Sequence, residues 1–137
     1  MNNITIEDIE KMCIEAARLQ LSGRELLENT QLVKDECNGT GAEWMGGICR
    51  VIDACNPAYI LPSYIHDLRY FFGGSDSDRK KADEEWLDNA IICVNDRYSW
   101  YNPLRYWERI KARKFYLALR SAGFAAWNAA VNGENEK

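Results

Sequence analysis

Apolar residues recur every three or four positions along much of this chain, a spacing that predicts helices, and no stretch indicates a strand. Near the N-terminus this spacing predicts a helix that extends to about Leu21, with its apolar side formed by Ile6, Ile9, Cys13, Ala16 and Ala17. Thr5 and Asp8 resemble a weaker capping box at its start. Gly23 ends this helix, and residues 24–29 add a short helical turn.

Two further helices are predicted on either side of a pair of glycines. Pro62 suits the first turn of a helix, where its missing N–H costs nothing, and Gly73 and Gly74 end that helix. Ser75 or Asp76 then caps a second helix with the apolar stripe Trp86, Leu87, Ala90, Ile91 and Val94. Asp83 lies on this stripe, because it precedes Trp86 by three residues. The short link predicts that the two helices run antiparallel.

The remaining segments complete a mainly α fold in one domain, residues 1–137. A long helix is predicted from about Pro103 to Val131, with one side formed by Ala112, Phe115, Tyr116, Leu119, Ala122 and Ala126. Gly123 loosens it by about 1 kcal/mol relative to alanine. Residues 37–47 hold four of the nine glycines and are predicted to form a loop. Residues 48–60 fit either a short helix or an extended segment.

The composition narrows the class of protein. Hydrophobic residues make up 47% and charged residues 28%, the balance of a soluble globular protein. The chain contains no apolar run of about 18 residues, and its acidic start lacks the plan of a signal peptide. The five cysteines form no CxxC pair, so a zinc ribbon is excluded and reduced thiols are expected. These features predict a cytoplasmic location.

Charge is unevenly distributed along the chain. The net charge of −4 argues against a nucleic-acid binder, but residues 103–120 carry six basic side chains and a single acidic one, Glu108. This segment either meets phosphates or a membrane surface, or complements residues 1–43, which carry nine acidic and four basic side chains. The aromatic segment 98–107 precedes and overlaps it, and either contacts lipid or packs in the core. No protein partner is indicated.

The only histidine, His66, is the main candidate for chemistry. Tyr70 follows it by one helical turn, and the antiparallel helix brings the Asp83 face towards both. A buried carboxylate beside histidine orients one ring nitrogen and leaves the other as a base, and Tyr70 is placed to donate to the carboxylate. The alternatives are a surface His66–Asp67 pair and a structural aspartate. A single histidine excludes an HD-type metal phosphohydrolase and histidine-based zinc sites.

At "HDLRY…ADEEW" the sequence resembles the phospholipase A2 superfamily, and in particular small bacterial and phage-borne proteins that share this plan, many of unknown function. The matching features are the loop "CNGTG" (37–41), "HDLRY" (66–70), "RKKAD" (79–83) and "GFAAW" (123–127), within residues 37–127. The paired cysteines that precede His-Asp in secreted members are replaced by Pro62 and Ser63.

This resemblance implies ester hydrolysis of phospholipid. His66 would be the general base, Asp83 would orient it, and Tyr70 would support Asp83. Asp67 and the main-chain carbonyls of Cys37, Gly39 and Gly41 would hold Ca²⁺, which prefers such hard oxygen ligands. The alternative is a binding or structural module, derived from a phage or prophage, that keeps the fold without turnover.

Overall fold

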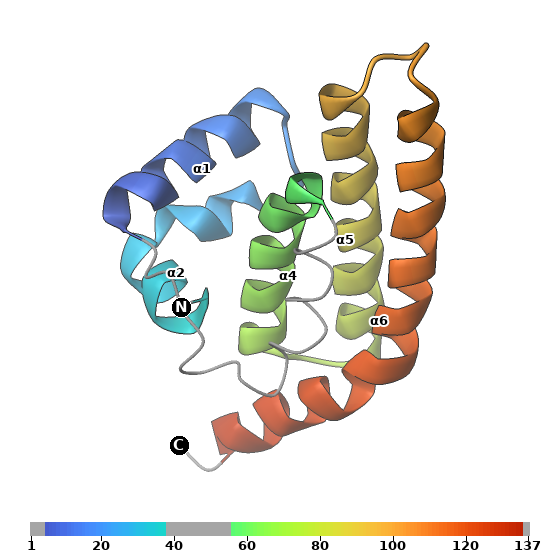
Figure 1. Cartoon of the computed structure of the whole chain (residues 1–137). Coiled ribbons are helices and arrows are strands. Elements are labelled where there is room, and N and C mark those ends of the chain that lie inside the picture. Colours follow the sequence, from blue (N-terminus) through green and yellow to red (C-terminus); the bar gives the residue numbers. More distant parts are fainter. Residues whose placement is uncertain (1–4, 38–55, 136–137) are drawn as a thin grey trace.

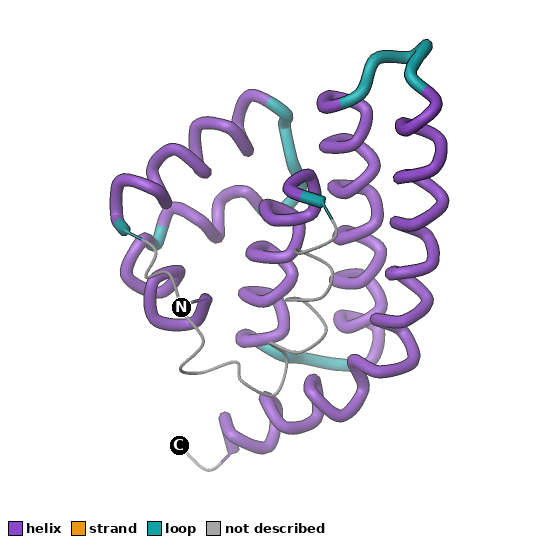
Figure 2. The backbone as a smooth tube through the Cα atoms, in the orientation of Figure 1, coloured by secondary structure: helices purple, strands orange, loops and turns teal. Residues whose placement is uncertain are grey.

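The computed structural model describes residues 5–37 and 56–135, and the regular elements there are all helices. In chain order they are α1 (Ile6–Arg18), η1 (Arg24–Glu28), α2 (Thr30–Cys37), η2 (Pro57–Tyr59), α4 (Ile60–Phe72), α5 (Asp76–Arg97) and α6 (Pro103–Asn135), where η marks a 3₁₀-helix. Figures 1 and 2 show α5 and α6 as a long hairpin, with α4 beside α5 and with α1, η1 and α2 on the other side of α4. The prediction of a mainly α fold is confirmed.

The helix starts follow the local sequence closely. At α1 the capping box is complete, because Thr5 Oγ1 accepts from the Asp8 N–H and the Asp8 carboxylate accepts from the Thr5 N–H, both at 3.1 Å. Ser75 and Asp78 form the same reciprocal pair at the start of α5. The predicted end of α1 is wrong by three residues. The helix ends at Arg18, and Leu21 is buried beyond it.

The predicted antiparallel arrangement of α4 and α5 is confirmed, and two glycines make the turn between them. Gly73 caps α4 with a φ of 70°, and Gly74 follows with a φ of 133°, a backbone region that residues with a side chain rarely adopt. A Cβ on Gly74 would collide with the Asp78 carboxylate, which is occupied in capping α5. The tightness of this turn sets how α5 returns alongside α4.

The core is formed by residues of all the described helices, and its aromatic part lies between η2, α5 and α6. Trp86 on α5 is 1% exposed, and its ring centroid lies 5.8 Å from that of Tyr59, which meets Phe115 of α6 edge-on at 5.6 Å. On the predicted stripe of α5, Trp86, Ala90 and Val94 are buried, while Leu87 and Ile91 are half-buried. The Tyr59 hydroxyl donates to the backbone carbonyl and the carboxylate of Glu108. The acidic side chain of segment 103–120 is therefore turned into the core.

The two cysteines whose thiols are described, Cys13 and Cys93, are free, as expected. Burial raises the pKa of the Cys93 thiol to about 12, so this side chain acts as a small hydrophobe of the core. Much of the predicted loop 37–47 and of segment 48–60 lies outside the described residues. Cys37 itself is the last residue of α2, and residues 57–60 are helical.

Helix α6 changes direction in its second half, so that its C-terminal part runs beneath α4 (Figure 1). Ser121 Oγ donates to the carbonyl of Leu117 at 2.9 Å, a bond to the preceding turn that often bends helices. Gly123, two residues later, lowers the cost of the bend. The change of direction allows Arg120, before the bend, to reach Asp83 of α5, and Trp127, after it, to reach Gly74 in the turn between α4 and α5.

The aromatic segment 98–107 is mostly on the surface. Tyr98 packs against the core, but Trp100 and Tyr101 are each 73% exposed, and Tyr106 and Trp107 are 51% and 65% exposed. Core packing was therefore the wrong interpretation for these four residues. In the N-terminal part, Arg18 pairs with Glu15 and with Asp96 of α5, and Glu25 pairs with Arg69 of α4.

The turn after α1 docks tightly on α4 and α5. The Ser22 N–H donates to Asn89 Oδ1 at 3.0 Å, and Asn89 Nδ2 donates to the Ser22 carbonyl at 2.9 Å. The next residue, Gly23, has a φ of 81°, and a Cβ there would lie 2.7 Å from Ile65 Cγ2 and 2.9 Å from Glu85 Oε1. Position 23 therefore requires glycine, because its φ is positive and because a Cβ there would overlap Ile65 and Glu85.

We therefore expect Gly23→Ala to lower the free energy of unfolding by about 1–3 kcal/mol, through left-handed strain and overpacking. Gln20 in the same turn has a φ of 55° and serves as a matched control. Gln20→Gly relieves strain there and should be close to neutral. Urea denaturation measures both, and equal stability of Gly23→Ala and wild type would contradict the packing at this turn.

Candidate functional site

Helices α4 and α5 bring together the three residues predicted to form a polar cluster. His66, Tyr70 and Asp83 are buried, with 1%, 0% and 0% of their surface exposed. His66 Nε2 lies 2.7 Å from Asp83 Oδ1, and the Tyr70 hydroxyl donates to the same oxygen at 2.8 Å. The rings of His66 and Tyr70 stack one turn apart on α4, with centroids 4.3 Å apart. The surface His66–Asp67 pair is therefore the wrong alternative.

Two arginines that sequence reasoning missed hold the other oxygen of Asp83. Arg120 Nη1 of α6 donates to Asp83 Oδ2 at 2.9 Å, and Arg79 Nη1 of α5 lies 3.6 Å from it. Arg79 was detectable, because it precedes Asp83 by one helical turn and shares its face. Arg120 gave no local signal, since its contact with Asp83 depends on how α6 packs.

These donors keep Asp83 ionised. Burial alone would raise the pKa of its carboxyl group, but the hydrogen bonds from His66, Tyr70 and Arg120 outweigh burial and lower it. Burial and the negative charge of Asp83 raise the pKa of Tyr70, so the phenol stays protonated and donates. An ionised carboxylate only accepts hydrogen bonds, so the proton between His66 and Asp83 is carried by Nε2.

The second ring nitrogen of His66 is the unusual atom of the cluster. Nδ1 is buried and has no hydrogen-bond partner among the described residues. With the proton on Nε2, Nδ1 of the neutral ring carries a lone pair and is the basic atom. An unpaired buried acceptor costs about 1–3 kcal/mol, and such atoms in folded proteins require a reason. A base held ready for a proton supplies one.

The C-terminal half of α6 closes one side of the cluster. Trp127 is 2% exposed, its indole N–H donates to the Gly74 carbonyl at 3.2 Å, and its ring meets Tyr70 edge-on at 5.0 Å. Trp127, the last residue of "GFAAW", therefore packs against Tyr70, the last residue of "HDLRY". Because α6 bends between them, Arg120 contacts Asp83 and Trp127 contacts Tyr70 of the same cluster.

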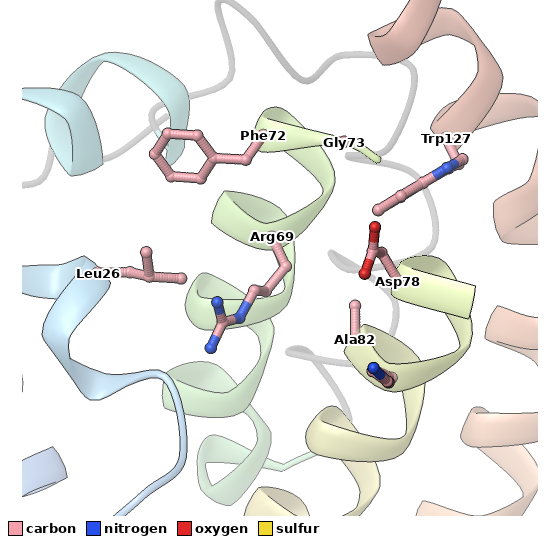
Figure 3. Close-up of a pocket in the computed structure, with 8 residues that line it drawn as sticks. Leu26, Arg69, Phe72, Gly73, Asp78, Ala82 and Trp127 are labelled. Atoms are coloured by element: carbon pink, nitrogen blue, oxygen red, sulfur yellow. The ribbon is translucent and has the colours of Figure 1, made fainter. Parts of the chain in front are cut away.

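A pocket of about 510 Å³ lies beside the cluster, between η1, the end of α4, the start of α5 and Trp127 (Figure 3). Ala82 and Trp127 belong both to its wall and to the surroundings of Asp83 and Tyr70. Its size falls within the range of about 300–1,000 Å³ that is usual for small-molecule sites. Arg69 also lines the pocket and donates two hydrogen bonds of 3.0 Å to Glu85.

The predicted calcium ligands are only partly within the described chain. Asp67 is half-buried on α4, and Cys37 ends α2, while Gly39 and Gly41 lie outside the described residues. Within residues 5–37 and 56–135, no group of three or more His, Cys, Asp and Glu side chains is placed to hold a metal ion. A calcium site here would therefore depend on main-chain carbonyls together with Asp67.

Comparison with models of protein families, with curated proteins and with solved structures finds no match for this chain. The geometry of the cluster is thus the main guide to function. Among the described residues, no helix combines the length and the apolar composition needed to cross a bilayer.

We predict that Asp83→Asn lowers the free energy of unfolding at neutral pH by about 3 kcal/mol or more, because it leaves buried cations without their counter-charge. The lowered pKa of Asp83 means that its stabilisation is complete above about pH 4 and is lost as pH falls through the folded-state value. The difference between variant and wild type should therefore shrink below about pH 4.

Urea denaturation at several pH values measures this difference. Glu84→Gln is the matched control, because Glu84 is the neighbouring carboxylate and is exposed. Equal losses in the two variants would show that Asp83 is not the anchor of the cluster.

Proposed function

We propose that this chain is a phospholipase A2-like ester hydrolase in which His66 acts as the general base. The observation that carries the proposal is the state of the His66 ring. Nε2 is held by ionised Asp83, and Nδ1 is basic and without a partner among the described residues. This is the arrangement that proton abstraction from a water molecule needs. The resemblance at "HDLRY…RKKAD" supports the same chemistry.

The proton balance of the reaction is simple. Nδ1 takes a proton from water as the water oxygen attacks the ester carbonyl, and the imidazolium that forms is stabilised by Asp83. The same proton then passes to the leaving alkoxide, and the carboxylic acid and alcohol are released. Tyr70, Arg79 and Arg120 are positioning residues, because they contact Asp83 and not the reacting atoms. The neighbouring pocket is large enough to take part of an acyl chain.

Calcium is part of this proposal. A carboxylate and main-chain carbonyls are the hard oxygen donors that Ca²⁺ prefers, so Asp67 and the carbonyls of Cys37, Gly39 and Gly41 fit the ion in chemical type. When bound, calcium would polarise the ester carbonyl and stabilise the negative oxygen of the tetrahedral intermediate.

A second function is favoured by the burial of His66. The imidazole is 0% exposed, and the Asp83 carboxylate is bound by groups from three helices, as in a purely structural network. The alternative is a binding or structural module that retains the cluster to fix the helix arrangement. The two functions differ in one respect, which is whether water and ester reach Nδ1.

The test of the first function is release of fatty acid from phospholipid vesicles in millimolar calcium. We expect His66→Gln to lower the rate by about 10²–10⁴-fold, because glutamine can still donate to Asp83 but cannot act as a base. Glu84→Gln should retain the wild-type rate. Activity unchanged in His66→Gln would contradict the assignment of the base, and a folded wild type without any release would favour the binding or structural module.

Calcium binding is tested separately, by titration calorimetry. We expect saturable binding by the wild type at millimolar calcium or below and its loss in Asp67→Asn, because the amide removes the charged ligand. Asp88→Asn, at an exposed position of α5, is the control and should bind as the wild type does. Binding that survives Asp67→Asn would place the ion elsewhere, and no binding in the wild type would remove calcium from the proposal.

A further inference from the structure

Helix α6 has two apolar sides, and only one of them faces the core. Ala112 and Leu119 are buried, with Phe115 half-buried between them. The opposite side carries Tyr106, Trp107, Ile110 and Leu117, which stay exposed, and Leu104 is also exposed in the first turn of α6. We call these residues, with the turn before them, the outer patch, which consists of Trp100, Tyr101, Leu104, Tyr106, Trp107, Ile110 and Leu117.

The exposure of the outer patch is not the normal scatter of surface hydrophobes. Trp107 is 65% exposed and Trp100 is 73% exposed, whereas Trp86 and Trp127 are 1% and 2% exposed. Single exposed apolar residues need no explanation, but a contiguous group of them marks an interaction surface. The Tyr106 hydroxyl donates to the Trp100 carbonyl at 3.1 Å, which ties the turn to the first turn of α6.

Three exposed cations lie in or next to the outer patch in sequence, while the exposed Asp96 beside Arg97 is paired with Arg18. Arg113 and Lys114 are exposed on α6 within it, and Arg97 is exposed at the end of α5. Glu108 is the only acidic residue in 103–120, and it is 8% exposed and accepts a hydrogen bond from Tyr59. The partner of this surface should therefore combine an apolar layer with negative charge.

We propose that the outer patch docks this protein onto an anionic lipid surface. Tryptophan and tyrosine rings favour the boundary between headgroups and acyl chains, the aliphatic side chains Leu104, Ile110 and Leu117 fit the acyl layer, and arginine and lysine attract anionic headgroups. Nucleic acid would use the cations and the aromatic rings but not these aliphatic residues. A second copy on the same face would bring two more exposed cations, Arg113 and Lys114, to a face on which Glu108, the only acidic residue of 103–120, is buried.

Docking at the outer patch does not depend on the proposed hydrolysis. From Asp83 to Arg97 along α5 the rise is about 20 Å, at about 1.5 Å per residue, so the cluster and the tip of the hairpin are separate regions. If the chain hydrolyses phospholipid, docking supplies the surface on which its substrate lies. If it does not, the outer patch alone places the protein on a membrane.

Vesicle flotation tests the proposal with diether lipids, which have no ester to hydrolyse, and with EDTA present. One set of vesicles contains phosphatidylcholine alone, and the other contains phosphatidylcholine with an equal amount of phosphatidylglycerol. We expect the full chain to float with the anionic vesicles, weakly or not at all with the neutral ones, and to be released by concentrated salt.

Two double variants separate the apolar from the electrostatic contribution. Trp100→Ser with Trp107→Ser should weaken binding at least about tenfold. Arg113→Gln with Lys114→Gln should weaken it about fivefold for each charge. Ile14→Ser, at a residue of α1 that is 69% exposed, and Lys11→Gln with Lys34→Gln are the controls and should bind normally. Thermal unfolding establishes that each variant is folded.

The outcomes separate lipid from other partners. No binding of the wild type to anionic vesicles, or equal binding by wild type and both double variants, would overturn the proposal. Light scattering that shows a dimer, dissociated by the tryptophan variant, would assign the outer patch to a second copy. If the wild type binds the anionic vesicles but releases no fatty acid from ester phospholipid, the proposed hydrolysis is contradicted and the docking site is still supported.

Discussion

The buried negative charge of Asp83 is the constraint on which the helix arrangement depends. An ionised carboxylate with none of its side chain exposed is tolerated only when donors satisfy both oxygens. The donors are His66 and Tyr70 on α4 and Arg120 on α6, and Arg79 on α5 itself adds an ion pair at 3.6 Å. A shift of any one helix would leave a charge uncompensated, so the cluster selects one packing of α4, α5 and α6.

The shape of α6 follows from the same constraint. Its first half must pack along α5 so that Arg120 reaches Asp83. Its second half must turn towards α4 so that Trp127 donates to the Gly74 carbonyl and contacts Tyr70. The bond from Ser121 to Leu117 and the glycine at position 123 make the bend between these halves less costly. A helix that continued straight could satisfy one contact and not the other.

The two proposals assign different tasks to the polar cluster and to the outer patch. Near the turn between α4 and α5, burial and paired charge hold one imidazole nitrogen as a base, which is the condition for proton transfer. Near the turn between α5 and α6, aromatic residues are exposed beside basic ones, which is the composition expected of the proposed lipid-docking surface. Burial thus stabilises the fold at the polar cluster, whereas the outer patch leaves large apolar side chains exposed.

Local features of the sequence determined most of the helices and the centre of the site. Capping residues, glycines and apolar spacing act within one or two turns, so they predicted both ends of α4, the start of α5 and the common face of His66 and Tyr70, and the antiparallel turn brought Asp83 to them. Tertiary structure decided the remaining features. These are the early end of α1, the contact of Arg120 with Asp83, the packing of Trp127 on Tyr70 and the exposure of Trp100 and Trp107. Each depends on which helix face another helix covers, and periodicity shows that a face is apolar without showing whether anything covers it.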